Sequence, residues 1–337
     1  AEIIFNLSSS NCIIGKHIFR CQMIKQQSVR VHCGYVYTSS GVGESTTDVV
    51  FSGSTYIAEN GDILTAGERF QRTNSMIIQE IDVERLRTDR QRNTKFTKDK
   101  TGHYRHINVA PIEREEDFTE PVHRTFSPMP FLPKKGKEDQ YCMDVFSIQT
   151  SALARRWEHT HSQTVVIGIS GGLDSTLALL VAVQTADLLG YDRSRVVGVT
   201  MPGFGTSDRT YQNALQLMEE LGITHREISI CEVTTQHLND IAHNIDIHDA
   251  TYENAQARVR TMILMDLANE LNGLVVGTGD LSELALGWCT YNGDQMSMYG
   301  INAGIPKTLV KYLVKYAAEN LYESKIGRAV QQECRDR

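Results

Sequence analysis

The string SGGLDST at residues 170–176 has the residue types of an anion-binding loop. Gly171 and Gly172 let the backbone turn tightly and approach a ligand. The string follows an apolar segment and precedes a helical pattern, so its unpaired N–H groups lie at a helix N-terminus, where the dipole favours an anion. The hydroxyls of Ser170 and Ser175 add further donors. This loop therefore predicts a phosphate site.

The same loop carries a carboxylate, Asp174, that would repel a bare phosphate. Its presence makes sense if Mg²⁺ lies between it and the phosphates, because magnesium is held in proteins by few carboxylates together with phosphate oxygens. The string is neither the Walker loop GxxxxGK[ST] nor the dinucleotide fingerprint GxGxxG. A lone glycine pair usually marks only a turn with a capping serine. The complete string between a strand and a helix favours a nucleotide site that uses Mg²⁺.

The loop must be positioned by the elements around it, which alternate between strand and helix from residue 141 onward. The apolar segments predict strands over residues 164–169, 195–201, 227–230 and 274–277. The helical patterns cover residues 145–157, 174–189, a stretch that Ser207 would cap, 233–245, 252–272, 282–286 and 306–318. Such alternation predicts a doubly wound parallel α/β sheet, with ligands beyond the carboxyl ends of its strands.

The first 95 residues have a different, α+β pattern. A helix is expected over residues 16–30, and strands over residues 2–7, 34–38, 49–52, 54–59, 63–66 and 75–83. Asn60-Gly61 is a strong hairpin signal. Residues 96–140 hold five of the chain's seven prolines and the solvated charge cluster that includes Lys134, which indicates a linker. The expected organisation is residues 1–95, the linker 96–140, a nucleotide-binding domain 141–321 and an unassigned tail 322–337.

Composition limits the function classes. The 337 residues are 41% hydrophobic and 22% charged, as in globular proteins, and no apolar run is long enough to span a membrane. The net charge of −7 argues against a nucleic-acid surface. None of the seven cysteines forms a CxxC pair, so we expect free thiols in a reducing compartment such as the cytoplasm. The histidines show no zinc pattern. The chain starts within an apparent strand, so we expect that a further segment precedes Ala1.

The SGGLDST string resembles the signature of the ATP pyrophosphatase family. Members of that family cleave ATP between the α and β phosphates and form adenylates on an adenine nucleotide alpha-hydrolase-like fold. Further strings resemble those of its glutamine-dependent NAD synthetases: they lie at residues 201–210, 252–260, 276–288 and 291–299, and at Pro306-Lys307-Thr308. This resemblance covers residue 141 to about residue 320. It implies ATP-dependent amidation of deamido-NAD to NAD through an acyl-adenylate, with release of AMP and pyrophosphate and with ammonia normally taken from glutamine.

The resemblance also implies roles for individual residues. Asp174 and Glu283 would hold Mg²⁺, and Asp174 and Lys307 would serve catalysis. The expected ATP-binding residues are Ser170, Gly171, Gly172, Asp174, Ser175, Arg260, Thr278 and Lys307. The expected deamido-NAD-binding residues are Asn254, Arg258, Trp288 and Asp294. A homo-oligomer is implied as well.

Residues 1–95 resemble the C-terminal part of a nitrilase-type glutaminase domain. The strings at residues 4–10, 15–17 and 48–54 carry this resemblance. That family uses a Glu-Lys-Cys constellation with the cysteine as nucleophile. All three residues precede the position of Ala1 in the family, and Cys12 does not occupy the nucleophile's place. We therefore assign no glutaminase catalytic residue to this chain.

Two alternatives remain open. The first alternative is another ATP pyrophosphatase, such as a GMP synthetase or a tRNA-modifying enzyme, although the tRNA-modifying enzyme would need a basic surface. A non-catalytic nucleotide-binding fragment on the same fold is the third reading. The presence of Asp174, Glu283 and Lys307 favours chemistry over binding alone. The stretch after Asn320 does not match the continuation expected of the family.

Overall fold

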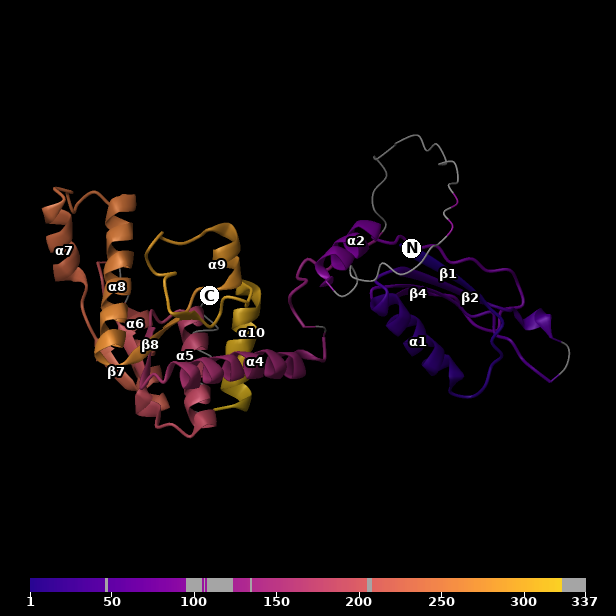
Figure 1. Ribbon diagram of the computed structural model, residues 1–337, viewed down its shortest axis with the longest axis horizontal. Coiled ribbons are helices and arrows are strands. Elements are labelled where there is room, and N and C mark those ends of the chain that lie inside the picture. Colours follow the sequence, from indigo (N-terminus) through magenta and orange to yellow (C-terminus); the bar gives the residue numbers. More distant parts are fainter. Residues whose placement is uncertain are drawn as a thin grey trace. The chain divides into compact units, whose positions relative to one another are not determined.

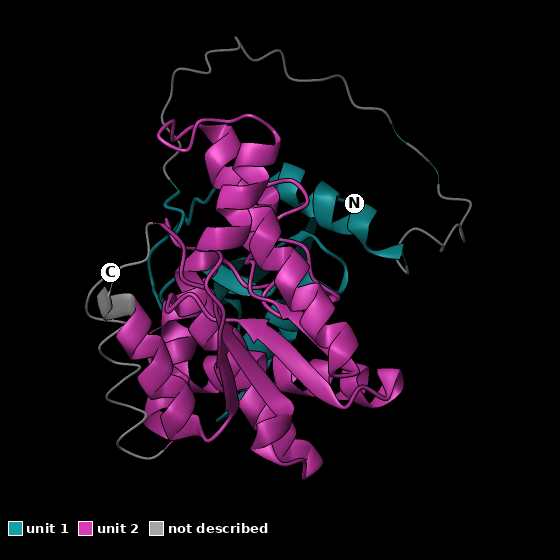
Figure 2. Ribbon diagram, turned by 90° about the vertical axis from the view of Figure 1, so that its left-hand side faces the viewer, with its two compact units in different colours: residues 1–127 teal, residues 128–337 magenta. Residues whose placement is uncertain are grey.

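The computed structural model describes residues 1–45, 48–94, 105, 107, 124–133, 135–204 and 208–322. The chain divides into two compact units, residues 1–127 and 128–337, and each has its own sheet (Figure 2). Most of the expected linker, including Lys134, lies outside the described residues, as do Ser207 and all of the expected tail after Tyr322. No helix in the described ranges is long and apolar enough to cross a membrane.

The sheet of the second unit is parallel throughout and has the order β7-β6-β5-β8-β9. Two of its strands, β7 and β8, are labelled in Figure 1. Its strands are β5 (Thr164–Gly168), β6 (Val196–Thr200), β7 (Thr224–Glu227), β8 (Gly273–Gly277) and β9 (Tyr299–Gly300). The chain runs outward from β5 to β7 on one side and continues through β8 to β9 on the other. This order confirms the doubly wound fold and makes the gap between β5 and β8 the switch point, where such folds bind ligands.

Helices cover both faces of this sheet. One face packs against α4 (Glu138–Thr160), α5 (Leu173–Leu189), α6 (Asp208–Leu221) and α10 (Lys307–Asn320). The other packs against α8 (Ala250–Glu270), on which α7 (Cys231–Asp240) lies. The short helix α9 (Leu281–Leu286) follows β8, and a 3-10 turn, η2 (Arg193–Arg195), precedes β6. Successive side chains of β5 point to opposite faces of the sheet. Val165 and Ile167 therefore pack in the core on the first face, and Val166 packs in the core on the second.

Helix α5 is the centre of the first core. Its residues from Leu177 to Val183 have no exposed surface, so the helix is held on all sides and its N-terminus has a fixed place. It ends at Gly190, whose φ of 67° is in the left-handed region favoured after a helix. The phosphate-loop candidate therefore sits at the start of the most deeply buried helix of the unit.

The first unit has a smaller mixed sheet of order β1-β2-β3-β4. Its strands are β1 (Ile3–Ser8), β2 (Gly34–Ser39), β3 (Thr55–Glu59) and β4 (Asp62–Ala66). β1 and β2 are parallel, whereas β3 pairs antiparallel with both β2 and β4. Helix α1 (Lys16–Arg30) packs on this sheet through Ile24, and the other helical elements in the described part of the unit are η1 (Val42–Glu44) and α2 (Val83–Arg92).

The predicted hairpin at Asn60-Gly61 is confirmed. Both residues have positive φ, 46° and 95°, and Glu59 pairs with Asp62 across the turn. Two central residues with positive φ are the requirement of a type I′ turn, which matches the twist of the flanking strands.

Several predicted elements were wrong. Residues 49–52 and 75–82 form no strand, because alternation alone supplies no partner for their backbone. Val83 instead starts helix α2, which Asp82 caps by accepting a hydrogen bond from the Arg85 amide at 2.9 Å. The strand expected at residues 227–230 lies earlier, as β7, since this edge strand is polar and lacks an apolar signal. Helix α4 also begins well before residue 145, inside the predicted linker.

Candidate active site

The SGGLDST string forms the turn between β5 and α5, as its pattern predicts. Gly171 has a φ of 77°, a conformation that favours glycine. The Ser170 hydroxyl accepts a hydrogen bond from the Gly172 amide at 3.3 Å and lies 3.3 Å from the Ser175 hydroxyl. The Ser175 hydroxyl in turn donates to the Gly172 carbonyl at 3.0 Å. These bonds set a compact loop with two hydroxyls at a helix N-terminus, an arrangement suited to phosphate oxygens.

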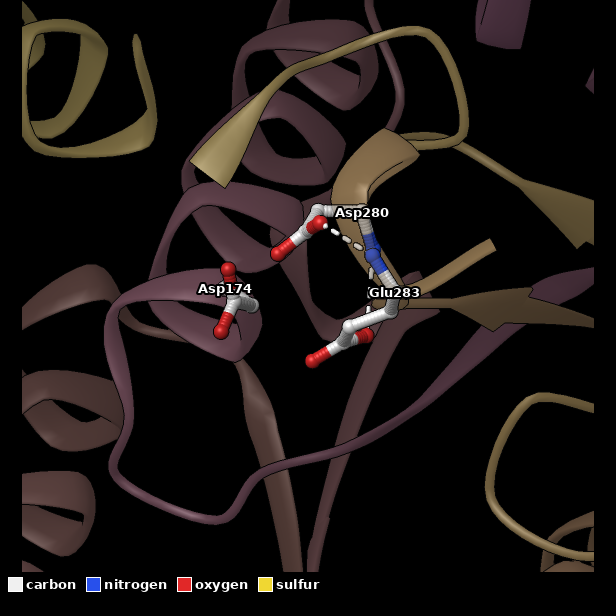
Figure 3. Close-up of side chains that lie close together, drawn as sticks. All are labelled: Asp174, Asp280 and Glu283. Atoms are coloured by element: carbon white, nitrogen blue, oxygen red, sulfur yellow. Dashed lines mark hydrogen bonds between the residues drawn. The ribbon is translucent and has the colours of Figure 1, made fainter. Parts of the chain in front are cut away.

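Three carboxylates converge beside this loop (Figure 3). Asp174 lies in the first turn of α5, and Asp280 and Glu283 lie at the start of α9. One oxygen of each is within 4.8 Å of the others. The structure thus brings together Asp174 and Glu283, which were expected to share a metal ion, and adds Asp280, which was not expected.

Asp280 holds Glu283 in place. Its side chain has no exposed surface, and its Oδ1 accepts hydrogen bonds from the amides of Ser282, at 2.7 Å, and Glu283, at 2.9 Å. The Glu283 carboxylate accepts a bond from the Asp280 amide at 3.2 Å in return. This is a capping box, and the Asp-x-x-Glu spacing before an apolar run is the signal by which the sequence could have revealed it.

One ammonium group faces all three carboxylates. The Nζ of Lys307 lies 2.6 Å from Asp174, 3.1 Å from Asp280 and 3.4 Å from Glu283. Burial lowers the pKa of Lys307, but the bonds and charges of these partners outweigh it and raise the pKa above its usual value. Lys307 therefore stays charged.

The donor set fits a magnesium ion. Three carboxylates facing one ammonium group leave two negative charges uncompensated, which is the charge of one divalent cation. The Oδ1 of Asp174 is buried and has no hydrogen-bond partner, so a buried lone pair is available as a ligand. Carboxylate oxygens are what Mg²⁺ prefers.

Two adjoining cavities open at the carboxyl edge of the sheet. The first has a volume of about 440 Å³ and mixed walls, which are apolar at Met201, Leu264 and Val276 and charged at Arg260 and Asp294. The second, of about 740 Å³, is the more polar of the two, and Asp174 and Glu283 are among its lining residues. Both cavities share three lining residues: Ser170, Thr278 and Asp294. The more apolar chamber therefore meets the more polar one at the phosphate-loop candidate.

Of the four residues expected to bind deamido-NAD, two line the cavities and two do not. Asp294 forms a two-point ion pair with Arg260, at 3.0 and 2.8 Å, and both line the first cavity. Trp288 lines the second cavity with 79% of its surface exposed. Asn254 and Arg258 do not line either cavity; Asn254 accepts a bond from the Thr290 hydroxyl at 2.8 Å, and Arg258 donates to the Tyr291 carbonyl at 3.3 Å. These two residues brace the loop that carries the others.

The comparison with known families finds a match within the second unit. A family model described as NAD synthase matches residues 146–326. The chain belongs to the NAD synthase family. The matched range contains the phosphate-loop candidate, the carboxylate cluster and Lys307, so the resemblance noted in the sequence is confirmed.

Individual relatives extend the likeness to both units. The glutamine-dependent NAD(+) synthetase of Mycobacterium leprae is 41% identical over 344 residues, which cover 98% of this chain and 50% of that protein. Its counterpart in Mycobacterium tuberculosis is 39% identical with the same coverage. The structure of the Acinetobacter baumannii glutamine-dependent NAD+ synthetase with ADP aligns with a TM-score of 0.53 and 25% identity, covering 98% of this chain and 54% of that one. The chain thus spans about half the length of the curated relatives it matches.

The sequence also gave no indication of two buried amides near the site, Gln149 and Asn302. A glutamine inside a helix and a single asparagine after a short strand have no spacing that marks them. Their contacts are visible only in three dimensions.

Proposed function

We propose that this chain uses ATP to activate the nicotinate carboxylate of deamido-NAD and transfers ammonia to it, giving NAD, AMP and pyrophosphate. The observation that carries the proposal is the junction of the two cavities. A phosphate loop, three carboxylates and a lysine lie at the point where an apolar chamber opens into a polar one. Reactions of ATP at phosphorus need little else besides positioning and charge neutralisation.

ATP would lie across this junction. The adenine ring suits the apolar chamber between Met201 and Leu264 at the carboxyl ends of β5, β6 and β8. The phosphates would then reach Ser170, Ser175 and the free amides of the first turn of α5. Arg260 is paired with Asp294 on the wall of the same chamber, so its role toward phosphate would require that pair to open.

Asp174 and Glu283 are the residues that would hold Mg²⁺, with Asp280 behind them. The metal supplies positive charge to the phosphate oxygens when it is bound. Lys307 holds its amine beside these three carboxylates while 53% of its side chain is exposed, so phosphates bound next to the cluster would be within its reach. It would carry a permanent positive charge to the phosphates.

The chemistry takes two displacements. A carboxylate oxygen of deamido-NAD attacks the α-phosphorus of ATP; a new C–O–P linkage forms while the bond to pyrophosphate breaks. Ammonia then attacks the acyl carbon with its lone pair, the bond to AMP breaks, and the nitrogen loses a proton to give the neutral amide. The protein's part is to hold the two substrates in line and keep water from the adenylate. Trp288 and Leu286, both on the wall of the polar cavity, are placed to cover it.

The source of ammonia is a separate part of the proposal. The relatives are named glutamine-dependent, and we propose that unit 1 is the C-terminal part of a nitrilase-type glutaminase domain. Because no residue of the Glu-Lys-Cys constellation is assigned here, we expect this chain by itself to use free ammonia. We also propose that it works as a homo-oligomer in the cytoplasm.

The deciding assay measures pyrophosphate and NAD formed from ATP, Mg²⁺ and deamido-NAD, with ammonium chloride and with glutamine in parallel. We expect activity with ammonium and none with glutamine. Pyrophosphate release with xanthosine monophosphate and not with deamido-NAD would instead support a GMP synthetase. Glutamate release from glutamine in step with NAD formation would contradict the assignment of ammonia as the direct substrate, and nucleotide binding without turnover would favour a non-catalytic fragment.

A further inference from the structure

Two buried amide side chains lie beside the carboxylate cluster. Gln149, on α4, is 6% exposed and Asn302, after β9, is fully buried. The Nε2 of Gln149 donates to the Oδ1 of Asn302 and to the Ile301 carbonyl, both at 3.0 Å. Gln149 thereby fixes the rotation of the Asn302 amide, because only one of its two ends accepts a hydrogen bond.

The other end of Asn302 joins two loops. Its Nδ2 donates to the Asp174 carbonyl at 2.9 Å and to the Thr278 carbonyl at 3.1 Å. Asp174 lies in the first turn of α5, at the end of the loop after β5, and Thr278 begins the loop after β8, more than a hundred residues later. A primary amide has two N–H donors, and Asn302 uses both to tie these loops together.

The two loops carry the carboxylates that must close on one ion. Asp174 supplies its carboxylate from the first, and Thr278 stands two residues before Asp280, whose cap fixes Glu283. Mg²⁺ requires near-ideal octahedral geometry with ligand distances of about 2.0–2.1 Å. A small change in the separation of the loops would therefore spoil the site even with every ligand present.

We propose that Asn302, oriented by Gln149, is a positioning residue that sets the spacing of the Asp174 and Asp280–Glu283 carboxylates and so the affinity of the site for a divalent cation. The inference deepens the proposed function and rests on it only for the choice of cation. A merely structural role would lower stability and leave cation affinity unchanged. Outer partners of metal ligands typically change affinity by about 10–100-fold when they are removed.

The test measures binding of Mn²⁺ alone, by electron paramagnetic resonance, to the whole chain and three variants. Asn302→Leu keeps the branched shape and the number of heavy atoms of the side chain and removes both donors. Gln149→Leu removes the bond that orients Asn302 and the bond to the Ile301 carbonyl, and it leaves both donors of Asn302 in place. Thr185→Ala is the control, since Thr185 is another fully buried hydrogen-bonding residue, further along α5 and outside both cavities. Thermal unfolding of each variant is recorded in parallel.

We expect Asn302→Leu to bind Mn²⁺ about tenfold more weakly or worse, Gln149→Leu to show a smaller loss, and Thr185→Ala to bind like the parent. Parent-like Mn²⁺ affinity in both leucine variants would overturn the proposal, as would an equal loss in Thr185→Ala. If Asn302→Leu does not fold, Gln149→Leu decides alone. A parent that binds Mn²⁺ but makes no NAD would refute the proposed reaction and leave this inference standing, so the two fail separately.

Discussion

Among the residues that the structure describes, each unit contains a buried acidic group with a basic partner, and the two arrangements differ in charge balance. In the first unit, Glu59 and Arg124 form a two-point ion pair at 2.7 and 2.9 Å, with side chains 1% and 13% exposed. Glu59 also accepts a bond from the Asp82 amide at 2.7 Å. The hydrogen bonds to Glu59 raise the pKa of Arg124 against the opposing effect of burial. One carboxylate is paired with one guanidinium group, and both oxygens of the Glu59 carboxylate accept hydrogen bonds.

In the second unit, Lys307 faces three carboxylates and leaves an oxygen of Asp174 buried without a hydrogen bond. The arrangement costs stability, because like charges are held close together in a partly buried place. The contrast separates two uses of buried charge. A matched and saturated pair stabilises a fold, whereas an unmatched cluster at a cavity is the arrangement that supports our proposal of a site for a cation and phosphates.

The largest effect should come from breaking the unmatched cluster at Asp174. We expect Asp174→Asn to lower the rate of NAD formation about 1,000-fold, since charge stabilisation of this kind is worth that order in active sites. The affinity for ATP should fall much less, because the loop amides and the apolar chamber remain. Rates with ammonium chloride and equilibrium ATP binding are compared.

Asp187→Asn serves as the matched control. It alters another carboxylate of the same helix, one that bonds to Arg193 and lines neither cavity. A parent-like rate in Asp174→Asn, or an equal loss in Asp187→Asn, would mean that the cluster has no special part in turnover.

Substitution in the Glu59–Arg124 pair should have the opposite effect: it should lower the stability and leave the rate of NAD formation nearly unchanged. Arg124→Met leaves Glu59 buried without its cation, and we expect the free energy of unfolding to fall by about 3–5 kcal/mol. The rate of ammonia-dependent NAD formation per folded molecule should stay within about twofold, since the phosphate-loop candidate, the carboxylate cluster and Lys307 all belong to the second unit. Calorimetry and the rate assay check the two halves of this prediction.

Arg87→Met is the control here. Arg87 pairs with Glu2 through side chains that are 57% and 38% exposed, where ion pairs contribute little. Its unfolding should be close to that of the parent. If both arginine variants unfold alike, the buried pair is not the stabilising contact that its geometry indicates.

A smaller effect is expected at Asp280. This residue has both a structural role, because it caps α9, and a place in the charged cluster, because it faces Lys307. Asp280→Ser keeps an N-cap oxygen and removes the charge. We expect about 10–100-fold slower turnover, with an unfolding temperature near that of the parent. Turnover as low as that of Asp174→Asn would show that Asp280 is a direct ligand and not a support.

The sequence predicted the parts of the site that are local and missed those that are not. SGGLDST between an apolar strand and a helix is a continuous string, so the loop and Asp174 were predictable from it, as was the Asn60-Gly61 turn. Asn302 and Thr278 meet through a hydrogen bond that depends on strand order, which no single segment encodes. The polar edge strand β7 was misplaced for a related reason, since its place in the sheet is decided by its neighbour β6.

The smallest effect concerns two thiols of the second unit, one in its core and one at its open cavity. Burial, helped by Asp139 and Glu138, raises the pKa of Cys142 to about 11, so at pH 8 its thiol keeps its proton in the folded state. Cys289 is exposed on the wall of the polar cavity. We expect iodoacetamide at pH 8 to label Cys289 and spare Cys142, and Mg²⁺ with ATP to slow labelling of Cys289 a few-fold. Peptide mapping by mass spectrometry measures both.

Labelling of Cys142 should rise only toward pH 11. Rapid labelling of Cys142 at pH 8 would show that the core opens. Unchanged labelling of Cys289 with saturating nucleotide would place ATP outside the polar cavity.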